Sequence, residues 1–331
     1  MISFASSGES HHERASRVRF PGDARFAFTI LDDTDDATVE NVRPIYDLLT
    51  ELGFRTTKTA WPLDCPEGSH RYYAAQTLAD ADYLDFMRDL LAEGYEAAYH
   101  GATMESSTRY RTERGLKAFC DLLGVAPTIY CNHGQNLENI YWGSSRYRTP
   151  VIRIPVAAIE RLLGKPRFAG HVPDSPYFWG DLCLGQFRFV RNFAFATLNN
   201  GSIPPCGPYR LASTPWVQFW FSTADAPNAT DFKRLVTQRS VRRLYEDGGA
   251  CILSTHLGKG YTSNGRVDPQ IEDTLRYIAS LPGWFRPVSD VLEFLLARRP
   301  EAALSGWQQL RLEGRHFTDR LRDRSHRLLR S

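Results

Sequence analysis

A small set of carboxylate and imidazole side chains, spread along the chain, has the chemistry of a hydrolytic site. Asp32 and Asp33 are adjacent in the sequence, and His100, His133 and His256 each stand beside a turn. One carboxylate and one or two imidazoles can hold a divalent ion, which polarises a carbonyl and lowers the pKa of a bound water. A second carboxylate can take the proton of that water, and another imidazole can protonate the leaving group. The residue types therefore predict metal-assisted hydrolysis.

Each of these residues follows a short apolar run that is typical of a buried strand. We expect such strands at 25–31, 96–100, 128–131 and 250–254, with a further one at 56–59. Amphipathic helices are expected between and after them, at 38–52, 80–93, 112–123, 230–246, 268–281 and 289–298. Strands that alternate with helices form parallel sheets, whose ligand sites lie at the carboxyl ends of the strands. The fold class is therefore α/β, and the strand ends should bring the five residues around one cavity.

The acidic run at residues 32–36 needs a separate explanation. Four carboxylates within five residues would be costly to bury, so we expect the first strand to end there at an exposed rim. Adjacent acids point in different directions and can divide the two tasks of ligand and base. The alternative is a solvated turn that caps the following helix, and at least Asp35 or Asp36 is expected to cap it.

Five segments in order along the chain resemble motifs of one family, the NodB-type polysaccharide deacetylases (carbohydrate esterase family 4). The first, Thr29-Ile-Leu-Asp-Asp33, resembles the Thr-Phe-Asp-Asp-Gly motif of that family. The others are 94–101, which ends in His100-Gly101; 130–134, which contains His133; 252–258, which contains His256; and 285–290. The similarity covers about 25–298, and the segment 144–217 is unmatched.

The resemblance implies a distorted (β/α)7 barrel that removes an N-acyl group from a sugar with the help of a divalent metal, zinc above all. By position it implies that Asp32 is the general base, that Asp33 and His100 are metal ligands, and that His256 is the general acid. It also implies a barrel at 25–298 with an irregular insertion at about 144–217. An extension at 1–24 and a basic helical tail at 299–331 flank the barrel.

The chain departs from the family pattern at two positions. Thr34 stands where the family has glycine after the acid pair, and Met104 stands where a second metal-binding histidine is expected. A thioether is a poor zinc ligand beside carboxylate and imidazole. Either Glu105 or His133 fills the gap, or no metal is bound, and His133 could instead contact substrate.

Several further residues are candidates for binding a sugar. The amides of Asn132, Gln135 and Asn136 suit sugar hydroxyls, or they bond the loop itself. Arg109 could pair with a carboxylate or phosphate of the substrate, or lie on the surface. Trp179 belongs to the aromatic-rich stretch within 144–217, where a ring could stack on a sugar or pack in the interior.

Composition excludes several classes of protein. The chain has 331 residues, 42% of them hydrophobic and 24% charged, as in an ordinary globular protein. A net charge of +2 argues against a dedicated nucleic-acid binder, and no apolar run is long enough to cross a membrane. The polar first twenty residues do not form a secretory signal, so we expect a cytoplasmic protein. The arginine-rich tail could lie on an anionic membrane surface, or be an ordinary packed helix.

The sequence thus favours a hydrolase that acts on the N-acyl group or another amide of a sugar. The resemblance suggests a role in bacterial surface polysaccharide assembly, such as O-antigen (lipopolysaccharide) or capsule. Two alternatives remain open: a catalytically inactive descendant that binds glycans or scaffolds other enzymes, and a hydrolase of a small non-sugar amide.

Overall fold

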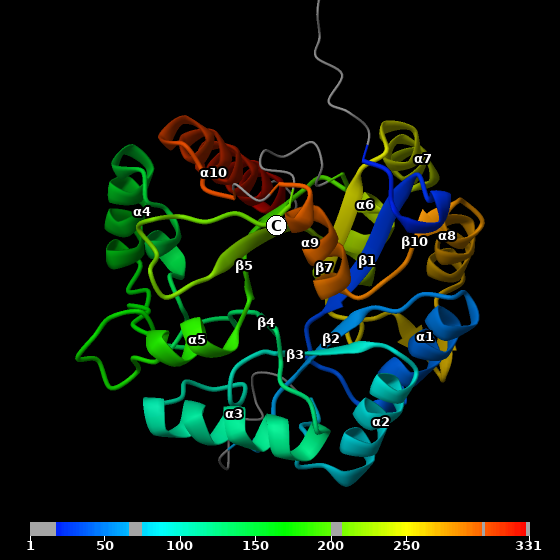
Figure 1. Cartoon of the computed structure of the whole chain (residues 1–331), viewed down its shortest axis with the longest axis horizontal. Helices are drawn as coiled ribbons and strands as arrows, with labels where there is room; N and C mark the ends of the chain where they lie inside the picture. The colour runs from blue at the N-terminus through cyan, green and yellow to red at the C-terminus, as the bar shows by residue number, and fades with distance from the viewer. Residues whose placement is uncertain (1–17, 66–74, 200–206, 300–301, 329–331) are drawn as a thin grey trace, which may run out of the picture.

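Seven parallel strands close into a barrel in the computed structural model, which describes residues 18–65, 75–199, 207–299 and 302–328, with side chains to 321 (Figure 1). The strands follow one another around the barrel in chain order, and β1 (Phe26–Asp32) closes it by pairing with β7 (Ala250–Thr255). The short β10 (Gly283–Trp284) adds a further parallel pairing at the start of β1. The architecture confirms the (β/α)7 barrel expected from the sequence.

The bounds of the elements are as follows. The other strands are β2 (Thr57–Ala60), β3 (Glu96–Tyr99), β4 (Ile129–Tyr130), β5 (Phe189–Phe195) and β6 (Phe219–Asp225), with a small hairpin of β8 (Thr262–Ser263) and β9 (Arg266–Val267). The helices are α1 (Val39–Glu51), α2 (Ala81–Ala92), α3 (Arg109–Leu123), α4 (Pro150–Leu162), α5 (Gly180–Gln186), α6 (Ala229–Leu235), α7 (Gln238–Asp247), α8 (Pro269–Ala279), α9 (Val288–Ala297) and α10 (Gly306–Leu328), with short 3-10 turns η1 (Pro21–Asp23) and η3 (Gly143–Arg146).

Helix α1 begins at a capping box rather than at the acidic run. The Thr38 side chain accepts from the Asn41 amide, and the Asn41 side chain accepts from the Thr38 amide. Such a cap contributes about 1 kcal/mol. Its presence corrects the expectation that Asp35 or Asp36 caps this helix, and it leaves Asp35 available for another role.

The segment 144–217 is more regular than expected. It contains η3, α4 and α5, and also β5, a full strand of the barrel that pairs with β4 and β6. The sequence of β5, Phe-Val-Arg-Asn-Phe-Ala-Phe, is apolar except for Arg191 and Asn192. Because of these two polar residues, a search of the sequence for apolar runs does not find this strand. Part of the expected insertion is therefore a strand of the barrel.

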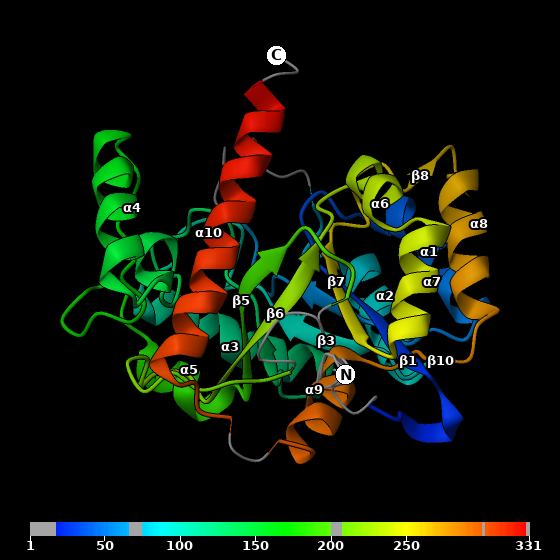
Figure 2. The same ribbon diagram turned by 90° about the horizontal axis from the view of Figure 1, so that it is seen from above.

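Helix α10 forms most of the expected C-terminal tail and is tied to the start of α4. Its buried Glu313 accepts hydrogen bonds from the backbone amides of Arg148 and Thr149, at 3.0 and 2.9 Å. Figure 2 shows α4 and α10 rising beyond the barrel on the same side. None of the described helices combines the length and the apolar character needed to span a membrane. The first 17 residues of the expected extension lie outside the described residues.

Candidate active site

A cavity of about 650 Å³ lies at the carboxyl ends of the barrel strands. The side chains that follow β1, β3, β4 and β7 line it, together with Arg191 and Asn192 of β5. The predicted residues Asp33, His100, His133 and His256 are all among its lining residues. Strand ends far apart in the chain therefore meet around one space, as the alternation of strands and helices predicts.

Asp35, His100 and His133 form a buried group with the composition of a metal site. The Asp35 Oδ1 atom lies 3.4 Å from His100 Nε2 and 3.5 Å from His133 Nε2. One ligand atom from each of the three residues lies within 4.8 Å of the others. Burial alone would raise the pKa of Asp35, but the imidazoles of His100, His256 and His133 that surround it outweigh burial and hold the pKa well below its usual value. The carboxylate is therefore ionised.

The orientation of the two imidazoles suits a ligand role. His100 Nδ1 lies 3.0 Å from the carbonyl oxygen of Cys131, which can only accept, so Nδ1 carries the proton and Nε2 keeps its lone pair toward Asp35. Burial lowers the pKa of His133 to about 4, which keeps that ring neutral. Of the two residues expected to fill the place left by Met104, His133 lies in this group, whereas Glu105 forms an ion pair with Arg111.

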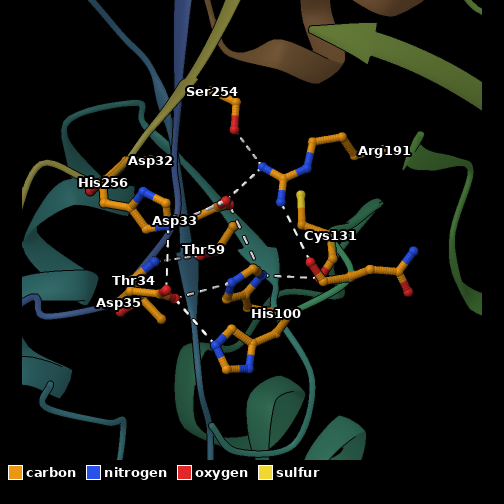
Figure 3. Close-up of polar contacts among 12 residues, drawn as sticks. Asp32, Asp33, Thr34, Asp35, Thr59, His100, Cys131, Arg191, Ser254 and His256 are labelled. Atoms are coloured by element: carbon orange, nitrogen blue, oxygen red, sulfur yellow. Dashed lines mark hydrogen bonds and ion pairs between the residues drawn. The ribbon is translucent and has the colours of Figure 1, made fainter. Parts of the chain in front are cut away.

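Asp33 faces the same cavity but is held by a cation (Figure 3). Its Oδ2 accepts from Arg191 at 2.6 Å, and the same Arg191 nitrogen donates to Ser254. Its Oδ1 makes no hydrogen bond within the described residues. Burial alone would raise the pKa of Asp33, but Arg191, His100 and His256 outweigh it and lower the pKa. One oxygen is therefore fixed in place, while the other is buried beside the cavity and has no hydrogen-bond partner among the described residues.

His256 lies on the opposite side of Asp33 and Asp35 from His100 (Figure 3). Its Nδ1 donates to the carbonyl of Pro227 at 2.8 Å, and its Nε2 lies 3.3 Å from Asp35 Oδ2 and 4.0 Å from Asp33 Oδ2. Burial alone would lower the pKa of His256, but the hydrogen bond to Asp35 and the nearby charges raise it. Lys259 also reaches Asp35, at 3.2 Å.

Asp32 points away from the cavity. Its carboxylate is fully buried and accepts from Lys58 Nζ at 2.7 Å, from the Tyr46 hydroxyl at 2.9 Å and from the Leu257 amide at 2.7 Å. It is absent from the lining of the cavity. The position implied for the general base thus holds a carboxylate whose oxygens are already occupied by three donors.

Comparisons with known proteins find likeness in the fold. One similar solved structure, described as a polysaccharide deacetylase from Mycobacterium smegmatis, is 14% identical, covers 86% of this chain and 95% of its own, and has a TM-score of 0.53. The chain has the polysaccharide deacetylase fold. The allantoinase PuuE is also similar, with 13% identity, coverage of 90% of this chain and 99% of its own, and a TM-score of 0.51. No family model matches the sequence, and no curated protein does so either.

Within this deacetylase fold, the acidic run is not the exposed rim expected from the sequence. Asp32, Asp33 and Asp35 are each at most 5% exposed. Their burial is possible because Lys58, Arg191 and Lys259 approach them from other parts of the chain and compensate the lost hydration.

In this deacetylase fold, only some of the residues expected to bind sugar line the cavity. Gln135 is exposed at the cavity, and Asn132 lines it while its amide bonds both backbone groups of Ile140. Asn136, Arg109 and Trp179 do not line it. Each has another partner: Asn136 donates to Glu138 and nearby carbonyls, Arg109 bonds both oxygens of Asp181, and the buried Trp179 donates to the Glu138 carbonyl.

Sequence reasoning missed three residues that shape this site. Asp35 belongs to the acidic run, for which the sequence predicts only that Asp35 or Asp36 caps the following helix. Arg191 and Lys58 each stand within a buried strand, where a cation needs a buried anion as partner. A cation within a buried strand was therefore the sequence signal that could have identified Arg191 and Lys58.

Lys58→Met is expected to lower the free energy of unfolding by about 3–5 kcal/mol, because it leaves the buried Asp32 charge without its cation. Urea unfolding measures the change. Lys233→Met is the matched control: its pair with Asp268 also spans 2.7 Å but is 29% and 27% exposed, so the cost should stay below about 1 kcal/mol. Equal stability of Lys58→Met and wild type would contradict a structural role for this pair.

Proposed function

We propose that this protein is a metal-assisted amide hydrolase that removes an N-acyl group from an amino sugar. The observation that carries the proposal is one cavity lined by a buried Asp35–His100–His133 group, by Asp33 and by His256. The set supplies a ligand group, a proton acceptor and a proton donor, which are the three elements that metal-assisted amide hydrolysis requires.

The residues present fit a divalent ion such as zinc. Asp35 Oδ1 is buried and makes no hydrogen bond within the described residues, which is costly unless a cation fills the position. The donor set of one carboxylate and two imidazoles suits zinc. We therefore assign Asp35, His100 and His133 as the ligands, and Asp33 no longer has that role. When bound, the ion would supply polarisation of the amide carbonyl and a lowered pKa of water.

Asp33 is assigned as the general base in place of Asp32. Arg191 fixes one of its oxygens, so the other can accept a proton from the attacking water without moving. His256 is assigned as the general acid, because Pro227 holds the proton on its Nδ1 and so turns Nε2 toward the reaction space. The protonated ring can donate from Nε2 to the nitrogen that leaves as an amine.

The sugar itself would contact the polar and aromatic wall outside this centre. Gln135 is exposed at the cavity, and Trp142 lines it and donates to the Gly134 carbonyl. An indole face beside amide groups suits a sugar ring and its hydroxyls. A place in O-antigen or other surface polysaccharide assembly, and a cytoplasmic location, stay predictions.

A small non-sugar amide is the second candidate substrate, since an allantoinase shares the fold. The volume of the cavity, about 650 Å³, favours a ligand of sugar size or more. A catalytically inactive role is less well supported, because such a protein would not need a base, an acid and three ligands around one space.

The test is acyl release by the purified, zinc-loaded protein. N-acetyl and N-formyl amino sugars, free and phosphate-linked, are compared with allantoin, and released carboxylate is followed by proton NMR. We expect turnover of an acylated amino sugar. If only allantoin were turned over, the substrate would be a small non-sugar amide instead of an amino sugar. If none of the amides were hydrolysed, the proposed function would be overturned.

A further inference from the structure

The cavity extends outward from the hydrolytic centre between α4 and α10. The far wall is apolar: Ile159 and Leu163 line it from the end of α4, and Phe317 and Leu321 line it from α10. These two helices rise together beyond the barrel (Figure 2). Beside this wall, Leu162 and Leu163 are 86% and 57% exposed, which is unusual for adjacent leucines. An apolar path therefore leads from the centre to the protein surface.

Arg146 lines the same cavity beside Asn192 of β5. Its guanidinium stacks on the Trp142 ring, 3.9 Å from the centroid, and donates to the Asn192 carbonyl. Its buried Nε makes no hydrogen bond within the described residues. Burial lowers the pKa of Arg146 to about 10, and the charges of Arg320 and Arg191 act in the same direction, so it is a cation at neutral pH.

The two arginines at this part of the cavity, Arg146 and Arg320, have no carboxylate within ion-pair distance among the described side chains, although both line the space. Two acids of the surroundings bind backbone amides instead: Glu160, which also lines the cavity, accepts from the Ser144 amide at 2.9 Å, and Glu313 accepts from the Arg148 and Thr149 amides. Arg191 differs, because Asp33 compensates it. Arg146 and Arg320 are thus a cationic pair that no described carboxylate binds directly.

We propose that the cavity binds an amphiphile in which the sugar is joined through a phosphate to a long apolar chain. The sugar would lie at the hydrolytic centre, the phosphate at Arg146 and Arg320, and the chain between α4 and α10. This inference rests on the proposed function for the identity of the sugar end. The cationic pair and the apolar wall carry the rest.

Two physical arguments favour this class of ligand. Guanidinium groups bind phosphate through paired hydrogen bonds, and a partly buried arginine without a carboxylate gains most from an anionic ligand. A water-soluble sugar phosphate would not cover the apolar side chains of Ile159, Leu163 and Leu321. A neutral glycan would leave both arginines uncompensated. A phosphate-linked lipid would bind the two arginines through its phosphate and cover the apolar wall with its chain.

The test is a binding experiment that needs no turnover. Decyl phosphate, inorganic phosphate and decyl maltoside, each below its micellar concentration, are titrated into the wild-type protein, and Trp142 and the other indoles report by fluorescence. We expect decyl phosphate to bind at least about 30-fold more tightly than either of the other two. Arg146→Gln and Arg320→Gln should each weaken it by about ten-fold or more, and Leu163→Asp should weaken decyl phosphate but not inorganic phosphate.

Arg242→Gln is the matched control, since it removes an equally charged but exposed side chain on α7 and should change nothing. Arg320 is exposed, so its variant remains informative if Arg146→Gln does not fold. If inorganic phosphate bound as tightly as decyl phosphate, the ligand would not need an apolar chain and that part of the proposal would be overturned. If decyl maltoside bound as tightly, the ligand would not need a phosphate and that part would be overturned. Because binding is read without catalysis, failure of the hydrolase proposal stays separate from failure of this one.

Discussion

Asp33→Asn is expected to reduce the rate of acyl release by about 10²–10⁴-fold while the protein remains folded. The asparagine oxygen can still accept from Arg191, so the position of the side chain is kept. What is lost is the second carboxylate oxygen, which has no hydrogen-bond partner among the described residues and is the proposed proton acceptor. The rate is measured on the best substrate of the acyl-release panel at saturating zinc, together with the midpoint of thermal unfolding.

Asp36→Asn is the control for this variant. It makes the same change of charge three residues away, but Asp36 is 39% exposed and its nearest ion-pair partner, Lys259, is 3.9 Å distant. Its rate should stay within about two-fold of wild type. If Asp33→Asn kept full activity, the base would have to be another group, and Asp35 or His256 would become the next residues to test.

Asp35→Asn is expected to abolish the stabilisation that zinc gives to the wild-type protein. An ion that binds only the folded state adds about 2.7 kcal/mol at a concentration 100 times its dissociation constant. Asp35 lies between the two imidazoles, so loss of its charge removes the central ligand. The measurement is thermal unfolding with zinc and with a chelator, for wild type and variant.

Two further variants decide between the possible ligand sets. Asp33→Asn should keep most of the zinc stabilisation, because Arg191 compensates Asp33 in this structure. Glu105→Gln should keep all of it, since Glu105 is paired with Arg111. If Asp33→Asn lost the zinc effect and Asp35→Asn retained it, the ligand role would return to Asp33, as the family resemblance implies.

Much of the barrel follows from local patterns in the sequence. The apolar runs before His100, His133 and His256, each followed by a turn, are enough to predict strands whose carboxyl ends carry imidazoles. Parallel strands joined by helices then have to meet in one sheet, and this geometry brings the three histidines together. The parallel α/β sheet, the position of the cavity and three of its histidines could therefore be predicted without coordinates, whereas the closed barrel is implied by the family resemblance.

Only the tertiary structure distributes the roles within the acidic run. Asp32, Asp33 and Asp35 are chemically identical and nearly adjacent, so no local signal separates a structural carboxylate from a base or a ligand. The difference comes from partners on distant elements: Lys58 of β2 compensates Asp32, Arg191 of β5 compensates Asp33, and the imidazoles after β3 and β4 surround Asp35. The cost of burying a charge depends on which cation reaches it, and that is decided only when the barrel closes.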